Sequence, residues 1–182
     1  MVVVGGFLLG AILFAQVASP IHQVFDPLQV QRFVSVKQIF GVPIKAPELT
    51  ITTLEGKKFT LKELSGQNQL VVINFWGTWC RPCIEEMPYF EKVHRAYQNK
   101  GVAIVGVATK DSLAAVREFI AQRGITYKIA LDDQDKITAA FGGMRALPTT
   151  IFIDSQLNVL KVHRGYLAQR DLDKNLKNLL QK

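Results

Sequence analysis

The stretch QLVVINFWGTWCRPCIEEMP, residues 69–88, joins a long apolar run to a pair of cysteines three positions apart. The run over residues 69–76 is apolar at nearly every position, which predicts a strand buried on both faces of a sheet. From about residue 81 to residue 100 the apolar side chains instead recur at the spacing of an amphipathic helix. Cys80 and Cys83 therefore lie where a buried strand gives way to a helix.

The rest of the chain from residue 46 alternates strand patterns with helical patterns. A hairpin is predicted at 48–53 and 57–60, and further strands are predicted at 102–108, 127–131, 149–154 and 158–164. Helical patterns occur at 61–64, 111–123, 135–141 and 168–181. In the helix at 111–123, the side chains expected to face the core are Leu113, Val116, Phe119 and Ile120. This order predicts an α/β fold with a central sheet covered on both faces and right-handed helical crossovers between parallel strands.

The formal charge of +7 is carried mainly by the two ends of the chain. Residues 1–45 carry +2 and residues 161–182 carry +4, whereas the body between them is nearly neutral at +1. No basic-aromatic motif accompanies the basic C-terminal helix, so a nucleic-acid-binding function is not indicated. The charge favours a solvated helix face, with an anionic lipid surface as the alternative.

The chain contains only two cysteines, and their spacing argues against a structural role. A disulfide that closes so small a ring removes little chain entropy, so it would stabilise the fold only weakly. A structural zinc site needs about four ligands, and the three histidines do not have the spacing of a zinc finger. The acidic residues between 132 and 135 are better explained by a helix-capping turn. We therefore expect neither a metal nor another cofactor.

The N-terminal residues 2–19 form an uncharged, largely apolar segment that is followed by Pro20. This segment is long enough to cross a bilayer. A cut after Ala18 would leave Gln16 where a signal-peptide cleavage site needs a small residue, so an uncleaved anchor is favoured over a signal peptide. The predicted organisation is an anchor or signal segment at 1–20, a linker at 21–45 and one domain at 46–182. Basic residues follow the apolar segment, which by the positive-inside tendency favours a cytoplasmic domain.

The position of the cysteine pair predicts different chemistry for its two members. Cys80 lies at the predicted helix N-terminus, where free N–H groups and the positive end of the helix dipole favour a thiolate. Cys83 lies one turn further into the helix, where it is more shielded. We therefore expect Cys80 to attack a disulfide and Cys83 to resolve the mixed disulfide. Trp79 supplies an apolar wall beside the reactive sulfur, and Pro82 restrains the turn.

A second motif, ALPTT at residues 146–150, directly precedes a predicted buried strand. Together with FWGTWCRPCIEEMP at 75–88, it resembles the thioredoxin superfamily and, within it, the TlpA/ResA-like branch. The resemblance extends from about residue 46 to the C-terminus. It implies a three-layer thioredoxin-like fold with a mixed central sheet and an N-terminal hairpin. The helix and strand at about 111–131 then correspond to the helix-strand unit that this branch inserts into the minimal plan.

The resemblance also implies a role for the ALPTT motif. Pro148 should follow a cis peptide bond and face the cysteines, and its missing N–H would keep that place clear. The backbone of Leu147 would pair with an extended segment of a protein substrate, a form of strand addition. Trp79, Leu147 and Pro148 are thus the expected substrate-binding residues.

The expected proton carrier differs from that of ordinary thioredoxin. Thioredoxin has a buried aspartate six residues before the nucleophile, where this chain has Asn74. The branch resembled here has a glutamate three residues after the second cysteine, which corresponds to Glu86. A partly buried carboxylate there would have a raised pKa and would exchange a proton with the thiols. Glu85 is a weaker candidate, and a solvated helix residue is the alternative for both.

The resemblance implies a membrane-anchored, extracytoplasmic thiol–disulfide oxidoreductase, a location opposite to the one that the basic residues favour. The implied substrate is the Cys-x-x-Cys-His haem site of apocytochrome c, and the implied electron donor is a membrane thiol carrier of the DsbD or CcdA type. A general periplasmic disulfide reductase is the close alternative. A peroxiredoxin-like thiol peroxidase and a non-catalytic binding module are weaker alternatives, because the chain retains a vicinal cysteine pair and Leu147-Pro148.

Overall fold

The computed structural model describes residues 43–132 and 134–181. The strands are β1 (Thr50–Thr52), β2 (Lys58–Thr60), β3 (Leu70–Trp76), β4 (Val102–Thr109), β5 (Lys128–Asp132), β6 (Thr149–Asp154) and β7 (Val159–Arg164). The helices are α2 (Leu61–Gly66), α3 (Arg81–Tyr97), the 3-10 turn η1 (Gln98–Lys100), α4 (Leu113–Arg123), α5 (Lys136–Ala140) and α6 (Gln169–Leu180). Every predicted helix and strand from residue 46 onward is present, with ends that differ by a few residues.

Five strands form the central sheet in the order β5-β4-β3-β6-β7. The β3–β4 and β4–β5 pairs are parallel, and the connections between these strands run through α3 and α4. The β3–β6 and β6–β7 pairs are antiparallel, so the sheet is mixed. The β1–β2 hairpin is antiparallel and separate, with Ile51 opposite Phe59. The central strand β3 thus receives neighbours on both sides, which explains its uninterrupted burial.

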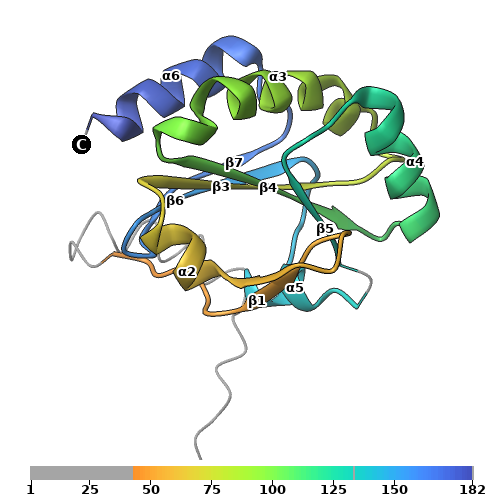
Figure 1. Cartoon of the computed structure of the whole chain (residues 1–182), viewed down its shortest axis with the longest axis horizontal. Helices are drawn as coiled ribbons and strands as arrows, with labels where there is room; N and C mark the ends of the chain where they lie inside the picture. The colour runs from red at the N-terminus through yellow and green to blue at the C-terminus, as the bar shows by residue number, and fades with distance from the viewer. Residues whose placement is uncertain (1–42, 133, 182) are drawn as a thin grey trace, which may run out of the picture.

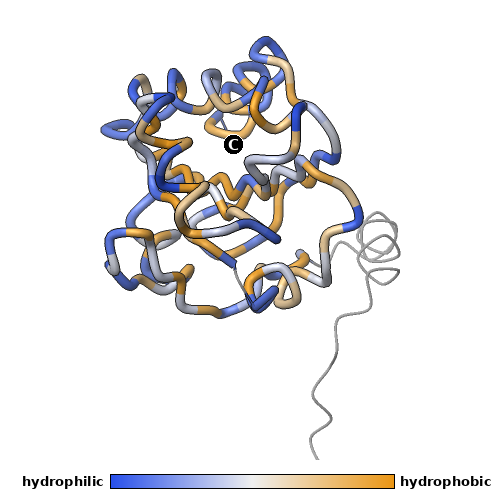
Figure 2. Tube along the Cα trace, turned by 90° about the vertical axis from the view of Figure 1, so that its right-hand side faces the viewer, coloured by the Kyte–Doolittle hydropathy of each residue, from blue (hydrophilic) through white to orange (hydrophobic). Residues whose placement is uncertain are grey.

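The side chains of β3 alternate between two hydrophobic cores. Leu70, Val72 and Trp76 pack with α3, α4 and α6 on one face. Val71, Ile73 and Phe75 pack with β1, α2 and α5 on the other. Figure 1 shows α3 and α6 above the sheet and α2, α5 and the hairpin below it, and in Figure 2 the hydrophobic segments gather between these layers. The alternation places Asn74 on the same face of β3 as Trp76, toward α3.

One prediction for α4 is wrong. Leu113 was expected in the core but is 41% exposed, whereas Val116 is completely buried. Leu113 is the first residue of the helix, directly after the cap at Ser112, and so it lies in the helix's exposed first turn. Phe119 and Ile120 are half-buried against the core. The helix therefore contributes one buried position rather than a full apolar stripe.

The predicted membrane segment at 1–20 and most of the predicted linker at 21–45 lie outside the described residues. Within the described chain, the Ile44 carbonyl accepts a hydrogen bond from the Val159 N–H, and Ala46 N–H donates to the Leu157 carbonyl. The chain therefore contacts the β7 end of the sheet from Ile44 onward. Among the helices in this described part, none is both long and apolar enough to cross a membrane.

Candidate active site

Cys80 and Cys83 form a disulfide at the start of α3, with their Cα atoms 5.3 Å apart. Cys80 is the N-cap residue of α3, and its carbonyl accepts the first helical hydrogen bond, from Ile84. Its side chain caps no backbone N–H, and the first turn holds no acidic residue. The N–H groups and the positive dipole end of α3 are therefore available to stabilise a thiolate on Cys80 after reduction.

The two sulfur-bearing residues differ in access to solvent. Cys80 is 6% exposed and lines an open pocket, whereas Cys83 is completely buried against the core under α3. A sulfur that faces a pocket can be reached by another protein's disulfide, and a sulfur with no exposed surface cannot. The geometry therefore distinguishes the two cysteines in the way expected from their places on the helix.

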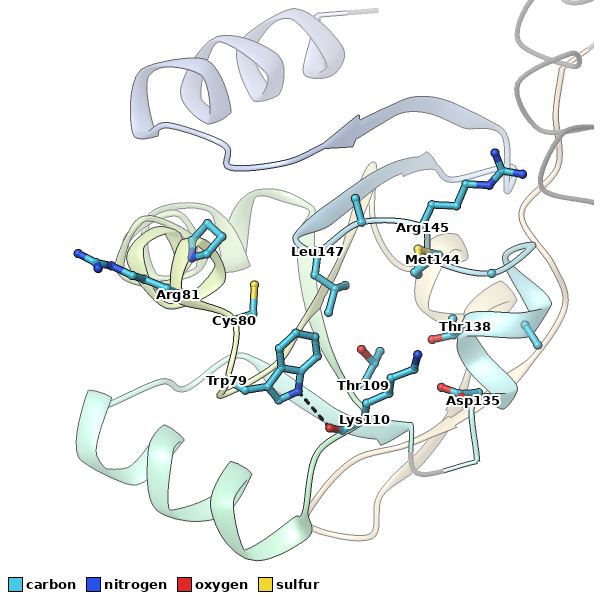
Figure 3. A pocket seen from close by; sticks show the side chains of 14 residues that line it. Trp79, Cys80, Arg81, Thr109, Lys110, Asp135, Thr138, Met144, Arg145 and Leu147 are labelled. Atoms are coloured by element: carbon cyan, nitrogen blue, oxygen red, sulfur yellow. Dashed lines mark hydrogen bonds between the residues drawn. The ribbon is translucent and has the colours of Figure 1, made fainter.

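Trp79 lies across the surface next to Cys80 and is 58% exposed. Its indole N–H donates a hydrogen bond to the Lys110 carbonyl at 3.0 Å, which fixes the ring against the end of β4 (Figure 3). Gly77 makes this position possible, because a Cβ there would lie 2.7 Å from the indole nitrogen. The predicted wall beside Cys80 is therefore held by a bond to a distant loop.

Asp111 ties the loop before the cysteines to the same region. Its carboxylate accepts hydrogen bonds from the Thr78 N–H at 2.6 Å and from the Thr78 hydroxyl at 3.0 Å. The α4 N-cap is provided by Ser112, whose hydroxyl accepts the Ala115 N–H. Ser112 therefore caps α4, and Asp111 positions the active-site loop.

Leu147 and Pro148 join the pocket to β6. The Leu147–Pro148 peptide bond is cis, as the family resemblance implies. Leu147 lines the same pocket as Cys80, and the Pro148 carbonyl accepts a hydrogen bond from the Gly165 N–H. Within residues 43–132 and 134–181, no partner bonds to the N–H or carbonyl of Leu147. That backbone is therefore open to pairing with an added strand.

Glu86 lies one turn beyond Cys83 and is completely buried. One carboxylate oxygen accepts a hydrogen bond from the Asn74 side-chain amide at 2.8 Å, and the other accepts the Leu167 N–H at 2.7 Å. The Asn74 amide also donates to the Thr150 hydroxyl at 3.2 Å, across the β3–β6 pair. Strands β3 and β6 and the loop before α6 thus hold this acid behind the disulfide.

Burial sets the protonation behaviour of Glu86. Desolvation disfavours the charged carboxylate and raises the pKa of Glu86 to about 7, although the hydrogen bonds from Leu167 and Asn74 lower it in part. Near neutral pH the acid therefore exists in both protonation states. This property suits a group that accepts and returns one proton.

The remaining acidic candidates have other partners. Glu85 is exposed and forms an i,i+4 ion pair with Arg81, 3.1 Å between Nε and Oε1, which is the ordinary role of a solvated helix residue. Asp132 accepts the N–H groups of Ile137 and Thr138 and so caps the start of α5. In the part of the chain that the structure describes, no group of three His, Cys, Asp or Glu side chains could hold a metal ion.

The pocket contains residues that the sequence analysis missed. It is lined by Trp79 and Cys80, by the end of β4 at Lys110, and by the α5–β6 loop with Met144, Arg145 and Leu147. Figure 3 shows these side chains around one hollow beside the sulfur of Cys80. Lys110 and Arg145 belong to no motif. The only signals in the sequence were that Lys110 directly follows the strand β4 and that Arg145 directly precedes the ALPTT segment.

The fold and the cysteine pair together define a class, the thioredoxin-like thiol–disulfide oxidoreductases. The sequence model of the AhpC/TSA family matches residues 42–162, and the chain belongs to that family. The thiol-disulfide oxidoreductase ResA of Bacillus thuringiensis (strain Al Hakam) is 36% identical over 149 residues, which cover 82% of this chain and 84% of ResA. The resemblance to the ResA-like branch is therefore confirmed, and the chain is a ResA-like thiol–disulfide oxidoreductase.

Solved structures support the same fold. A thioredoxin-family thiol:disulfide interchange protein from Chlorobium tepidum TLS is 30% identical with a TM-score of 0.69, covering 76% of this chain and 97% of that one. A secreted thiol-disulfide isomerase from Corynebacterium glutamicum is 26% identical with a TM-score of 0.67, covering 75% and 86%. The predicted thioredoxin-like fold with a mixed sheet and an N-terminal hairpin is confirmed.

Proposed function

We propose that this enzyme reduces disulfides of proteins outside the cytoplasm, with Cys80 as the attacking nucleophile and Cys83 as the resolving thiol. The observation that carries the proposal is the unequal access of the two cysteines. Cys80 lines an open pocket at a helix N-terminus, and Cys83 is completely buried beside Glu86 on the next turn. A disulfide of another protein can therefore reach the Cys80 sulfur but not the Cys83 sulfur.

The exchange proceeds in two steps that start from the reduced enzyme. The Cys80 thiolate attacks one sulfur of the substrate disulfide, forms a mixed disulfide and releases the other substrate sulfur as a thiolate. Cys83 then loses its proton and attacks the Cys80 sulfur, which releases the second substrate thiolate. The substrate gains two electrons, and the enzyme ends as the Cys80–Cys83 disulfide of the structure. A donor dithiol returns two electrons to the enzyme.

Glu86 is proposed to handle the proton of Cys83. Its carboxylate accepts the thiol proton as Cys83 attacks, and returns it when the donor reduces the disulfide. Burial that raises the pKa of Glu86 to about 7 supports this role, because proton transfer is most efficient when the carrier titrates near the working pH. Asn74 does not titrate and acts by positioning the carboxyl group.

The substrate segment is proposed to lie along Leu147, held by backbone hydrogen bonds and by contact with Trp79. The Leu147 side chain and the indole both line the pocket next to Cys80, which supports this placement (Figure 3). Pro148 ends the segment without an N–H that would compete for the substrate sulfur. Recognition through backbone bonds accepts many sequences, so further selectivity must come from side chains around the pocket.

The resemblance to ResA-like proteins supports two finer proposals. The substrate is the disulfide form of the Cys-x-x-Cys-His haem site of apocytochrome c, with other exported thiol proteins as the alternative. The donor is a membrane thiol carrier of the DsbD or CcdA type. The apolar residues 2–19 and the secreted relative from Corynebacterium glutamicum support a membrane-anchored enzyme with an extracytoplasmic domain. A reporter fused after residue 182 would distinguish the two possible orientations.

A trapping experiment tests the roles of the cysteines. Reduced Cys83→Ser protein is mixed with oxidised insulin or with an oxidised Cys-x-x-Cys-His peptide, and adducts are mapped by mass spectrometry. We expect a stable mixed disulfide on Cys80, no adduct in Cys80→Ser, and loss of insulin reduction in both variants. An adduct that forms on Cys83 of the Cys80→Ser protein at the same rate would overturn the assignment. Faster reaction with the haem-site peptide than with insulin supports the cytochrome substrate, and equal rates support the general reductase.

A further inference from the structure

The pocket beside Cys80 is large enough to receive part of a polypeptide. Its volume is about 690 Å³, and it extends from Trp79 and Cys80 across the end of β4 to the loop that precedes the cis peptide bond. Binding pockets for small ligands have volumes of about 300–1,000 Å³. A substrate that reacts at Cys80 therefore places its neighbouring residues in or over this pocket.

The charged residues that line the pocket are mainly cationic. Arg81, Lys110 and Arg145 contribute positive charges, whereas Asp135 is the single carboxylate in the lining that the structure describes. The formal charge of 46–160, in which all four residues lie, is only +1. The positive charge at the pocket is therefore a local feature of the active site and not a consequence of a basic surface.

The three cations differ in where their charges lie. Arg81 is bound to Glu85 on the helix surface, which offsets its charge. In Figure 3 the Arg145 guanidinium points away from Cys80, whereas the Lys110 ammonium extends into the pocket toward Thr138. The Lys110 backbone has a positive φ of 51° and accepts the Trp79 indole N–H, so the lysine is held at the end of β4 by the active-site loop itself.

We infer that the pocket binds an acidic side chain of the protein substrate, close in sequence to the reacting cysteine, and that Lys110 is the residue that selects it. This inference rests on the proposed function, because it assigns a preference to the substrate of the same site. A carboxylate that enters the pocket pairs with the Lys110 ammonium and with the hydroxyls of Thr109 and Thr138. A cationic side chain at that place meets repulsion from Lys110.

The position of the acidic residue follows from an extended substrate. Alternate side chains of a strand point to the same face, so a substrate paired with Leu147 directs the cysteine and the residue two positions away toward the enzyme. The reacting cysteine of the substrate occupies the end of the pocket at Cys80. The direction of the substrate strand then decides whether the residue two positions before it or the residue two positions after it lies over Lys110. The acidic residue is thus expected two positions from the reacting cysteine on one side only.

The test uses the full chain and a set of oxidised peptides. Each peptide carries one disulfide and has Asp, Asn or Lys two positions before or after the reacting cysteine, and kcat/KM for reduction is measured at low and high salt. We expect the wild-type enzyme to prefer Asp over Lys by about fivefold to tenfold at one of the two positions, a ratio that falls toward one at 1 M salt. Lys110→Met should reduce the ratio to about one, and Lys110→Glu should invert it.

Lys177→Met provides the matched control, because it removes the same charge from an exposed position in the last turn of α6, outside the pocket. Its ratio should equal that of the wild type. The inference is overturned if Lys110→Met keeps the wild-type preference for Asp, or if the wild type shows no preference. In either case, reduction of the Asn peptides would still support the proposed function. If the wild type reduces none of the peptides and no insulin, the proposed function fails and this inference fails with it.

Discussion

The two sides of the Cys80–Cys83 disulfide differ in exposure and in bonding. On the outer side, Trp79 is 58% exposed and Cys80 lines an open pocket. On the inner side, Cys83 and Glu86 are both completely buried, and each carboxylate oxygen of Glu86 accepts a hydrogen bond. One turn of α3 thus separates the surface proposed to bind the substrate from the enclosed carboxyl group proposed to carry a proton.

The difference shows how a reactive pair can serve two tasks. A carboxyl group needs burial to titrate near neutral pH, whereas a thiol that attacks another protein needs access. Placing Cys80 at the N-cap and Glu86 in the second turn of the same helix satisfies both needs. Variants of the inner side should therefore change how stability depends on pH. Variants of the outer side should change the mobility of the loop before α3 and the substrate preference.

The largest effect on stability is expected from Asn74→Asp. The new carboxylate would lie 2.8 Å from Glu86 in a site with no exposed surface, where two charges cannot both be retained. We expect a loss of about 3–5 kcal/mol in the free energy of unfolding at pH 8 and a smaller loss at pH 5, where one carboxyl is protonated. Urea unfolding at pH 5 and pH 8 measures the two losses. Asn99→Asp, the same change at an exposed position, should cost little at either pH, and equal losses at pH 5 and 8 would contradict the explanation.

Glu86→Gln should remove a pH dependence that the wild type shows. The folded state keeps the Glu86 proton up to a pKa of about 7, whereas the unfolded chain loses it near 4.5, so wild-type stability falls as pH rises through that window. The fall amounts to about 3 kcal/mol. The variant should therefore gain stability relative to the wild type between pH 5 and pH 8, and Asn74 can turn its amide to accept from the new Gln.

The neighbouring residue provides the control for this prediction. Glu85→Gln removes a carboxylate from an exposed ion pair on the same helix, so its unfolding curve should follow the wild-type slope with pH. Parallel slopes for the wild type and Glu86→Gln would show that Glu86 titrates normally in the folded protein, and the proposed proton carrier would be lost.

A smaller effect is expected from Asp111→Ala on the outer side. The change removes two hydrogen bonds that Thr78 donates, and because both residues are only part-buried we expect a loss of about 1–2 kcal/mol in the free energy of unfolding. Because Cys83 and Glu86 are held by other elements, amide hydrogen exchange should accelerate at Thr78 and Trp79, in the loop before α3, but not along α3 itself. Asp173→Ala on α6 serves as the control. Faster exchange throughout α3 would show that the two sides of the disulfide are not independent.

The parts of the fold that were predictable depend on local patterns. The apolar run of β3 and the helical spacing after it place Cys80 at the helix start without any knowledge of the rest of the chain. The ALPTT segment likewise identified Leu147 and Pro148 next to a buried strand. Leu113 was wrongly predicted to be buried. Helical periodicity indicates which face of the helix a residue lies on, but it does not indicate whether the first turn of the helix is covered by other elements.

The parts that were not predictable depend on long-range contacts. Asp111 reaches Thr78 across 33 positions, and the Leu167 N–H reaches Glu86 across 81, in both cases without a motif in the partner. Lys110 enters the pocket because β4 ends beside β3, which fixes where its backbone lies. The family resemblance singled out Glu86 as the candidate acid, but the hydrogen bonds that hold its carboxylate could be seen only in the folded chain.

The reduction potential of the Cys80–Cys83 couple tests the central claim most directly. The protein is equilibrated in dithiothreitol or glutathione redox buffers at pH 7, and the fraction of oxidised enzyme is measured by thiol alkylation. A reductase of protein disulfides should have a potential near that of thioredoxin, about −270 mV, and a potential near that of DsbA, about −120 mV, would contradict the proposal and define an oxidant instead.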